Sequence, residues 1–448
     1  MATLDRLREI VKSHRPAVPV VADNAKFVHE ERHVSAAIGP EAALTLGGAL
    51  VERSDGQVII IDREYTAGML HGRMPIGEIV STIEDGGDAL QLMAKAWPSF
   101  APSASEGKPA AQRRMLFLDL ETTGLFGGAG TQAFLVGCAA IDGTSIRVRQ
   151  FLLPGFEHER AVLSELQAWA AHHGALCSYN GRTFDVPLIE TRFMFHRVPC
   201  PLDGVPHLDM LHAARRLWRQ RPLTMGTPDP DDSSCSLAVL EKHIAGLHRV
   251  GDVPGYEIPS RFFKFVRTGD PRPLEAVLEH NRLDLISLAA VLARAIVLIN
   301  RGPAAASTAQ EAYGLARVYE RGGAHDNAEA SLLKTIDFVK RVGAEPEVHG
   351  EALRRLAWIR RRHRRPHEAA EAWQELATLP RCAASLRREA AEALAIHHEH
   401  RSKNLDVAKQ HVLDLLSDPD SNKPRVRHRL DRLERKLARR DDARLPLN

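Results

Sequence analysis

The sequence predicts an α/β domain with a mixed sheet, followed by an all-helical C-terminal region. Within residues 111–300, three strand-like segments, a helix, a fourth strand and a second helix follow one another. A long apolar helix at 274–299 ends this part, and from residue 303 onward every periodic segment has helical spacing. Because 448 residues exceed one ordinary core, we expect two or three domains.

The elements of the α/β domain follow from apolar spacing and from turn residues. Alternating or continuous apolar runs predict the strands, and "DGTS" predicts a hairpin turn between the second and third. The expected strands are 114–124, 131–142, 145–154 and 175–181, and the expected helices are 159–173, 185–197, 211–220, 236–246 and 274–299.

For residues 1–110, the sequence predicts a small mixed N-terminal region that ends in a linker. "GQVIIIDREY" (56–65) has the composition of a strand, with glycine and aspartate as punctuation. The segments 76–83 and 88–97 are short strands or helices. The segment 99–114 is small, polar and contains proline, which is typical of a linker.

Three similar segments predict tetratricopeptide-like helical repeats over residues 303–440. Small residues recur at matching places in them, as paired helices need for close packing. The spacing of about 40 residues exceeds the roughly 34 of true tetratricopeptide repeats. The segments are 313–336, 353–376 and 391–416, with Ala316, Ala357 and Ala395 aligned, and Ala328, Ala369 and Ala408 aligned.

Composition indicates a soluble cytoplasmic protein with no membrane segment. Hydrophobic residues make up 44% and charged residues 26%, and no apolar run is as long as a spanning helix. The N-terminus lacks the apolar core of a signal peptide. Five scattered cysteines without a CxxC pair argue against a disulfide framework or a zinc site. The net charge of +3 does not distinguish between classes of partner.

The stretch "LDLETTGL" (118–125) places two acids inside an apolar run. On a strand, residues two apart point to the same side, so Asp119 and Glu121 leave one face together. Two carboxylates this close repel unless a cation lies between them, and Mg²⁺ or Mn²⁺ prefers oxygen ligands. A solvated acidic turn at a strand end is an equally good interpretation of this stretch alone.

Two further acids lie where a site would need them. In "SYNGRTFDVPLI", Asp185 begins a helix, with Asn180 five residues before it. In "LEHNRLDLISL", Asp284 interrupts an apolar helix face one turn after His280. An ionised aspartate that faces a core is rare unless it is paired or bound to a metal. A solvated Asp284 and a structural His280 are the alternatives.

These motifs together carry a resemblance. "DLETTG", "YNGRTFD" and the late helix with Asp284 resemble the DEDD 3′–5′ exonuclease superfamily of the ribonuclease-H-like fold. The second motif is similar to the YN-x-x-x-FD form in the proofreading domains of B-family DNA polymerases. With "CSLAVLEKHIAG", "VPGYEIPSRFFKF" and the helical repeats, the whole is most similar to bacterial YprB-type ribonuclease-H-like proteins.

The resemblance implies a ribonuclease-H-like mixed five-stranded sheet, flanked by helices, with four acids at one end. It implies two divalent ions, Mg²⁺ or Mn²⁺, held by Asp119, Glu121, Asp185 and Asp284. Asp119 would bridge the two ions, and Glu121 would position water or the terminal hydroxyl of the substrate. Two such ions would clamp the attacking and leaving oxygens of a phosphodiester.

The chain departs from the superfamily at one catalytic position. The subclasses place Tyr four residues, or His five residues, before the last Asp, whereas here His280 has the Tyr spacing. An imidazole at that place still suits a base that orients or deprotonates water. Expected substrate-binding side chains are Thr122, Asn180 and Asn281. Local turn and helix hydrogen bonding is the alternative for the two asparagines.

Other polar features favour structural roles. For Asp209, in "PHLDMLHAARRLW", a helix N-cap is preferred over a site role. The arginines after it, and the basic run "IRRRHRRPH" (359–367), are solvated faces or phosphate contacts. "GLFGGAGTQAF" (124–134) lacks the GK[ST] of a phosphate loop and predicts a turn.

The sequence therefore predicts a metal-dependent nuclease, a 3′–5′ exonuclease on single-stranded DNA or RNA. Asp119, Glu121, Asp185 and Asp284 bind the ions, His280 orients the water, and the repeats bind a protein partner or guide the substrate. The alternative is a nucleic-acid-binding or scaffold protein that keeps the frame without cutting. The complete set of acids favours the enzyme, and His280 at the Tyr spacing favours the scaffold.

Overall fold

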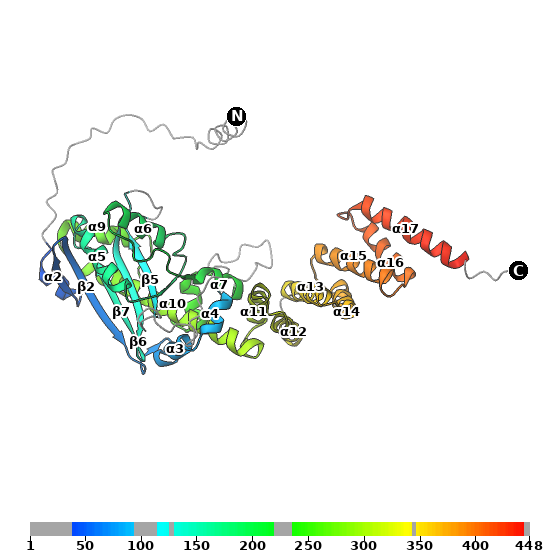
Figure 1. The fold of residues 1–448 in the computed structure, drawn as a ribbon, viewed down its shortest axis with the longest axis horizontal. Helices are drawn as coiled ribbons and strands as arrows, with labels where there is room; N and C mark the ends of the chain where they lie inside the picture. The colour runs from blue at the N-terminus through cyan, green and yellow to red at the C-terminus, as the bar shows by residue number, and fades with distance from the viewer. Residues whose placement is uncertain (1–37, 94–113, 125–129, 219–234, 343–345, 443–448) are drawn as a thin grey trace, which may run out of the picture. The chain divides into compact units, whose positions relative to one another are not determined.

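The computed structural model describes residues 38–93, 114–124, 130–218, 235–342 and 346–442. Residues 99–113 of the expected linker and residues 125–129 of the glycine-rich turn lie outside these ranges, as does Arg219, one of the arginines that follow Asp209. Within them, the α/β part and the helical C-terminal region have the predicted order (Figure 1).

A seven-stranded mixed sheet forms the centre of the α/β part. Its strands lie in the order β1-β2-β7-β6-β5-β8-β9. The pairs from β1 to β5 are antiparallel, whereas β8 pairs parallel with both β5 and β9. The strands are β1 (Ala49–Arg53), β2 (Gly56–Tyr65), β5 (Met115–Thr122), β6 (Ala133–Asp142), β7 (Ser145–Leu152), β8 (Ala175–Ser178) and β9 (His207–Asp209).

The sheet is wider than the five strands that the resemblance implies, because the N-terminal region adds β1 and β2. The strand expected at 56–65 is confirmed as β2, which pairs with β7 along Ile59 to Tyr65. Val58, Ile59 and Ile61 of β2 are buried. The sequence does not show this pairing, since the two strands come from separate parts of the chain.

Helices cover both faces of the sheet. One face packs against α3 (Ile76–Glu84), α7 (Met210–Leu217), α8 (Leu237–Ile244) and α10 (Glu275–Arg301). The other packs against α5 (Glu159–Ala170), α6 (Asp185–Phe195) and α9 (Ile258–Thr268). The first of the segments left open as strand or helix is α3, and the second begins with α4 (Gly87–Met93).

The long helix α10 is the centre of the first core. Arg272–Ala305, which contains it, includes an 18-residue window with a mean hydropathy of 2.0, which by length and composition alone is enough to span a membrane. In this structure 72% of that apolar window is buried inside the protein, and a core helix of a soluble protein passes the same test. The packing accounts for its apolar character, since Leu285, Ile286 and Leu288 are buried in the core.

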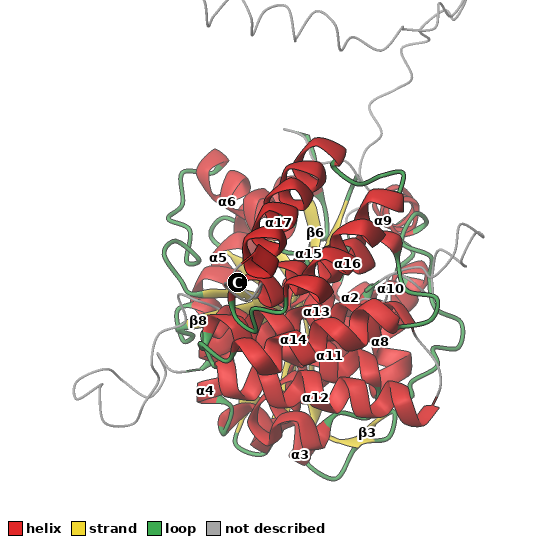
Figure 2. Cartoon of the chain, turned by 90° about the vertical axis from the view of Figure 1, so that its right-hand side faces the viewer, coloured by secondary structure: helices red, strands yellow, loops and turns green. Residues whose placement is uncertain are grey.

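The C-terminal region is helical, as predicted (Figure 2). Each of the three similar segments spans a pair of helices, and the aligned Ala316, Ala357 and Ala395 are fully buried. The helices are α11 (Ala309–Gly322), α12 (His325–Val342), α13 (Pro346–Arg362), α14 (Pro366–Thr378), α15 (Ala384–His400), α16 (Leu405–Ser417) and α17 (Lys423–Asp442).

The basic run at 359–367 is partly structural. Arg360 Nε binds Glu329 Oε1 at 3.0 Å, and Arg365 Nη1 binds Glu329 Oε2 at 2.6 Å. Arg365 also pairs with Glu368. These contacts join α12 to the turn between α13 and α14, so part of the run's charge is already neutralised within the protein.

Candidate active site

The alternation of β5 decides where the two acids of "DLET" point. Leu116, Leu118 and Leu120 pack with the α5–α6–α9 core, whereas Phe117 packs with the α10 core. Asp119 and Glu121 continue the Phe117 side, so both carboxylates leave the sheet on the face that α10 covers. The β5–β6 register shifts between Glu121 and the next residue, so regular pairing stops at the acids.

Asn281 of α10 fixes Asp119. Its Nδ2 donates to Asp119 Oδ2 at 2.8 Å and to the Asp119 carbonyl at 3.2 Å. Its Oδ1 accepts from Gln150 Nε2 at 2.8 Å, and the side chain is fully buried. Gly137 on β6 makes room for it, because an added Cβ would lie 2.1 Å from Asn281 Oδ1.

Electrostatic repulsion acts among the predicted acids and raises pKa values. Burial, followed by the charges of Asp284, Glu121 and Asp185, raises the pKa of Asp119 well above its usual value. Burial and the charges of Asp284 and Asp185 likewise raise the pKa of Glu121. Asp185 at the start of α6 and Asp284 in the middle of α10 therefore lie close enough to the two acids of β5 for their charges to act on them.

Asp185 is placed by the loop that precedes it. Asn180 has a left-handed backbone, with φ of 65°, and its N–H donates to Asp209 Oδ1 at 2.8 Å. The N–H of Arg182 donates to Asp209 Oδ2 at 3.1 Å. Burial and the Asp209 charge raise the pKa of Asp185 to about 7. Gly181 is needed here, since a Cβ would lie 2.4 Å from Ser178 Oγ.

Asp209 has the predicted N-cap role and a second one. Its Oδ1 accepts from Leu211 N at 3.0 Å at the start of α7. Its carboxylate also holds the 179–184 loop, as just described. The sequence favoured a structural role for Asp209 but did not show that this role supports the segment before Asp185.

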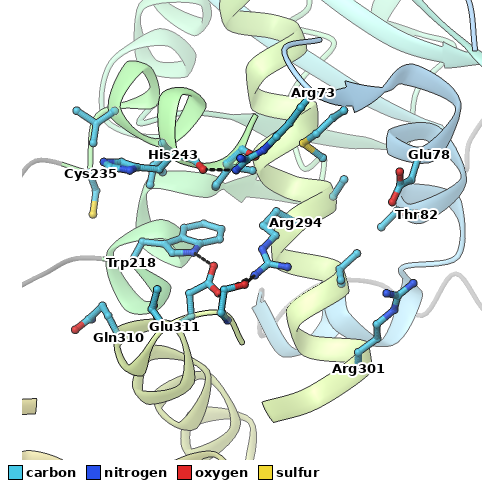
Figure 3. Close-up of a pocket in the computed structure, with 18 residues that line it drawn as sticks. Arg73, Glu78, Thr82, Trp218, Cys235, His243, Arg294, Arg301, Gln310 and Glu311 are labelled. Atoms are coloured by element: carbon cyan, nitrogen blue, oxygen red, sulfur yellow. Dashed lines mark hydrogen bonds and ion pairs between the residues drawn. The ribbon is translucent and has the colours of Figure 1, made fainter. Parts of the chain in front are cut away.

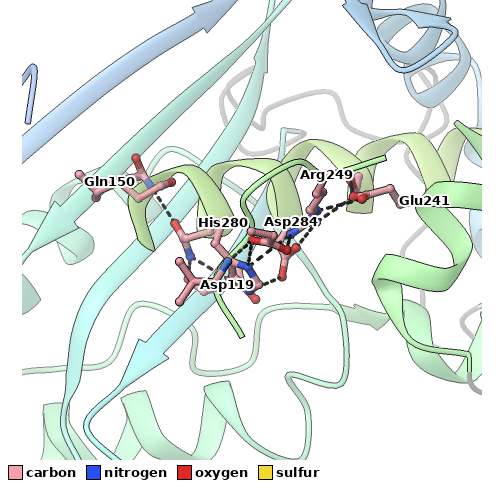
Figure 4. Close-up of polar contacts among 11 residues, drawn as sticks. Asp119, Gln150, Glu241, Arg249, His280 and Asp284 are labelled. Atoms are coloured by element: carbon pink, nitrogen blue, oxygen red, sulfur yellow. Dashed lines mark hydrogen bonds and ion pairs between the residues drawn. The ribbon is translucent and has the colours of Figure 1, made fainter. Parts of the chain in front are cut away.

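Asp284 is paired with an arginine that the sequence analysis did not single out. Arg249 Nη2 donates to Asp284 Oδ1, and the same guanidinium holds Glu241 through two bonds of 2.7 and 2.8 Å (Figure 4). Glu241 also accepts from Ser287, whose hydroxyl contacts His71 Nε2 at 2.8 Å. A buried polar chain therefore runs from the β3 segment (Leu70–His71) to the acids.

His280 lies beside Asp284 and is oriented by Asp252. Its Nδ1 is 2.7 Å from Asp252 Oδ1, and its Nε2 is 3.8 Å from Asp284 Oδ2. When Nδ1–H donates to a carboxylate, the neutral ring presents a lone pair at Nε2. This lone pair faces the acidic cluster, which is where a water-activating base would be needed.

The three side chains predicted to bind substrate have different surroundings in the structure. Thr122 Oγ1 donates to the Gly124 carbonyl at 2.8 Å, which is a local turn contact. Asn281, which we predict to bind substrate, is fully buried between Asp119 and Gln150 in this structure, where it positions Asp119. Asn180 shapes the loop through its backbone, and its side chain is half-buried.

Sequence reasoning missed Arg249, Asp252 and Glu241. Arg249 and Asp252 lie in "GLHRVGDVPG", a glycine- and proline-containing loop without periodicity. Glu241 faces inward from α8 and is 2% exposed. A charged residue among the apolar positions of "SLAVLEKHI" is the one signal that pointed to a buried partner.

The donor set suits a hard divalent cation. The four acids offer only carboxylate oxygens, they come from three separate segments, and their repulsion would fall on binding of a cation. Across the ranges that the structure describes, no group of three or more His, Cys, Asp or Glu side chains is arranged to hold a metal. One Asp284 oxygen is engaged by Arg249, which is the contact that such an ion would have to replace.

A cavity of about 560 Å³ lies elsewhere, lined by residues of α3, α8, α10 and α11 (Figure 3). Arg294 Nη2 binds Glu311 Oε2 at 2.7 Å, and Trp218 Nε1 donates to Glu311 Oε1 at 3.1 Å. Arg73 donates to the His243 carbonyl at 2.8 Å. None of the four acids lines this cavity, and through these contacts Glu311 of α11 is joined to Arg294 of α10 and to Trp218.

Comparison with known proteins agrees with the fold. Residues 116–296 match the model of the RNase_H superfamily, so the α/β part contains a ribonuclease-H-like domain. The chain is 29% identical to YprB of Bacillus subtilis (strain 168) over 398 residues, which is 86% of this chain and 87% of that protein.

Among solved structures, the chain is similar to a family B DNA polymerase from the hyperthermophilic archaeon Pyrobaculum calidifontis. The TM-score is 0.33 and the identity is 16%, over 48% of this chain. The matched part is 30% of the polymerase chain.

Proposed function

We propose that the protein is a metal-dependent nuclease, a 3′–5′ exonuclease that hydrolyses single-stranded DNA or RNA. One observation carries this proposal: Asp119, Glu121, Asp185 and Asp284 come from distant segments and are all partly exposed, and the charges of the other three raise the pKa of Asp119. Such a concentration of unfavourable charge is typical of functional sites. The resemblance of the motifs to the DEDD exonucleases supplies the polarity and the substrate class.

The four acids would hold two divalent ions, Mg²⁺ or Mn²⁺. Bound there, such ions supply Lewis-acid stabilisation of the attacking and leaving oxygens of a phosphodiester. The protein's own residues do the rest. Asn281 keeps Asp119 in place, and Asp209 keeps the loop that carries Asp185.

His280 is the proposed base. Asp252 accepts a hydrogen bond from Nδ1–H, so that the free Nε2 can take the proton of the attacking water. General bases in this role typically contribute about 10²–10⁴-fold to the rate. The half-buried position of His280, with 19% of its side chain exposed, leaves water access to the ring.

The test uses purified full-length protein with Mn²⁺ or Mg²⁺ and end-labelled single-stranded DNA and RNA. Stepwise shortening from the 3′ end is expected, with none when phosphorothioate linkages protect that end. Asp119→Ala and Asp284→Asn are expected to abolish it, and Asp203→Asn, an exposed acid outside the cluster, to leave it unchanged. Wild-type cleavage no faster than that of Asp119→Ala on both substrates would end the enzyme proposal.

The second candidate is a protein that binds nucleic acid without cutting it. The ion pair between Arg249 and Asp284 favours this candidate, because it already neutralises one of the four acids. Salt-dependent binding of single-stranded oligonucleotides without turnover would support it. In either case we propose a cytoplasmic protein whose tetratricopeptide-like helices bind a protein partner or guide the substrate.

A further inference from the structure

Arg249 is the centre of an unusual group of carboxylates. Its guanidinium contacts Glu241 through two bonds, Asp284 through one, and Asp252 through a contact of 3.3 Å. Only 7% of the side chain is exposed. A planar guanidinium has five N–H donors in a fixed fork, which lets it serve several carboxylates at once.

The contacts with Glu241 and Asp284 differ in kind. Glu241 is 2% exposed, accepts both bonds of the fork, and is held in turn by Ser287. Asp284 has 21% of its side chain exposed, and its charge raises the pKa of Asp119 and of Glu121. Glu241 is therefore the anchor of Arg249, and Asp284 is the partner that can be exchanged.

The charge around Asp284 explains why an exchangeable cation is useful. Among the residues that the structure describes, Asp119, Glu121 and Asp185 form no ion pair, whereas Asp284 pairs with the guanidinium of Arg249 and lies beside His280. Without a metal, four clustered carboxylates would repel one another. Arg249 offsets part of that repulsion, and it does so at an oxygen that a divalent ion would need.

We propose that Arg249 is the counter-cation of the metal-free site and competes with a divalent cation for the Asp284 carboxylate. This inference rests on the proposed function, because it takes the four acids to be the metal-binding set. On metal binding, Arg249 releases Asp284 and stays on Glu241. The same residue thus stabilises the empty site and raises the metal concentration that the site requires.

The test measures Mn²⁺ binding to the full chain by isothermal titration calorimetry, without nucleic acid. Arg249→Gln removes the competing cation, and its dissociation constant for Mn²⁺ is expected to fall about fivefold or more. Arg360→Gln is the matched control, because it breaks another poorly exposed ion pair, with Glu329, far along the chain. The control is expected to bind Mn²⁺ as the wild type does.

Arg249→Gln leaves Glu241 buried and unpaired, so it is tested alongside two milder variants. The double variant Glu241→Gln/Arg249→Gln removes both buried charges, and Arg249→Lys keeps the charge but not the fork. Both are expected to bind Mn²⁺ more tightly than the wild type. Thermal unfolding supplies a second readout: the metal-free Tm of Arg249→Gln should be below that of the wild type, and the difference should shrink with saturating Mn²⁺.

The outcomes separate this inference from the proposed function. Unchanged or weaker Mn²⁺ binding in all three Arg249 variants, with measurable wild-type binding, would overturn the competition and leave the nuclease proposal standing. Tight binding in the variants with none in the wild type would support the competition and contradict the nuclease proposal. No binding in any protein would overturn both.

Discussion

Asn281 holds Asp119 by a hydrogen bond of 2.8 Å from its amide to Oδ2, although 162 residues separate the two in the chain. Gln150 on β7 orients the amide through a second bond of 2.8 Å, and Gly137 on β6 leaves the space that it fills. Three elements of the fold are thus used to place one carboxylate. The predictions that follow concern such supporting contacts.

Replacing Asn281 by leucine should reduce nuclease activity without unfolding the protein. The change removes all three hydrogen bonds of the amide at similar volume. Loss of a residue that orients a metal ligand typically costs about 10–100-fold in activity or metal affinity. The free energy of unfolding should fall by about 1–3 kcal/mol, because Gln150 loses an acceptor. Single-turnover cleavage and urea unfolding check the two effects, and full activity would show that Asp119 needs no such support.

Gly137→Ala should disturb the same hydrogen bond between Asn281 and Asp119, because Gly137 lies against the Asn281 amide. The new Cβ would lie 2.1 Å from Asn281 Oδ1, so the amide has to move away from Asp119. Activity should fall together with stability, because overpacking of a dense core costs about 1–3 kcal/mol. Gly87→Ala is the matched control, since an added Cβ there meets nothing within 4 Å. Equal behaviour of the two variants would contradict this account.

Asp209→Ala should loosen the loop before Asp185. Three backbone N–H groups, of Asn180, Arg182 and Leu211, lose their acceptor, and we expect a loss of about 2 kcal/mol in the free energy of unfolding. Cleavage should slow as well, because the loop positions Asp185. Thr308→Ala removes only an N-cap, that of α11, and should lower stability without altering the cleavage rate per folded molecule.

Asp252→Asn should impair His280 as a base. The amide no longer favours the ring with its proton on Nδ1, so the lone pair at Nε2 is less available. The cleavage rate at saturating Mn²⁺ should fall toward that of His280→Ala, by up to about 10²–10⁴-fold. Binding of a single-stranded oligonucleotide should be unchanged. A wild-type rate in Asp252→Asn, with loss in His280→Ala, would remove Asp252 from the mechanism.

The C-terminal helices should be sensitive to acid through Glu399. Burial raises the pKa of Glu399, but hydrogen bonds from Arg432 and Lys436 on α17 outweigh it and lower the pKa from 4.5 to about 2. A lowered folded-state pKa contributes stability that is complete above pH 4.5 and is lost as the pH falls toward 2.

Circular dichroism of thermal unfolding between pH 7 and pH 2 checks this dependence. Glu399→Gln should be less stable at pH 7, by roughly 3 kcal/mol, and should show a flatter decline with acid. Glu392→Gln removes a more exposed pair between the same two helices, with Arg425, and should keep the wild-type profile. The same acid dependence in Glu399→Gln would assign the decline to other groups.

Much of the fold could be predicted because its signals are local. The strand at 56–65, the core strands and the apolar helix that contains Asp284 each follow from apolar spacing and turn residues. The N-cap role of Asp209 follows from its place before a helical run. The attachment of β2 to β7 could not be predicted, since strand pairing between distant segments leaves no periodic signal.

Part of the candidate site could likewise be predicted from local signals, and part of it could not. Alternation along β5 sends Asp119 and Glu121 to one face, and one helical turn keeps His280 on the same side as Asp284, so their chemistry is present in the sequence. Arg249 comes from a loop whose course depends on packing, and Asn281 differs from a solvated helix residue only by burial.

The sequence by itself therefore determined which acids this protein has and which elements carry them, because spacing fixes direction within a strand or a helix. Only the tertiary structure decided what each acid faces: a buried amide for Asp119, a capping aspartate for the loop of Asp185, and a guanidinium for Asp284. The reason is physical. A charge is stabilised by the groups within a few ångströms of it, and the number of residues between two groups in the sequence does not give their distance in space.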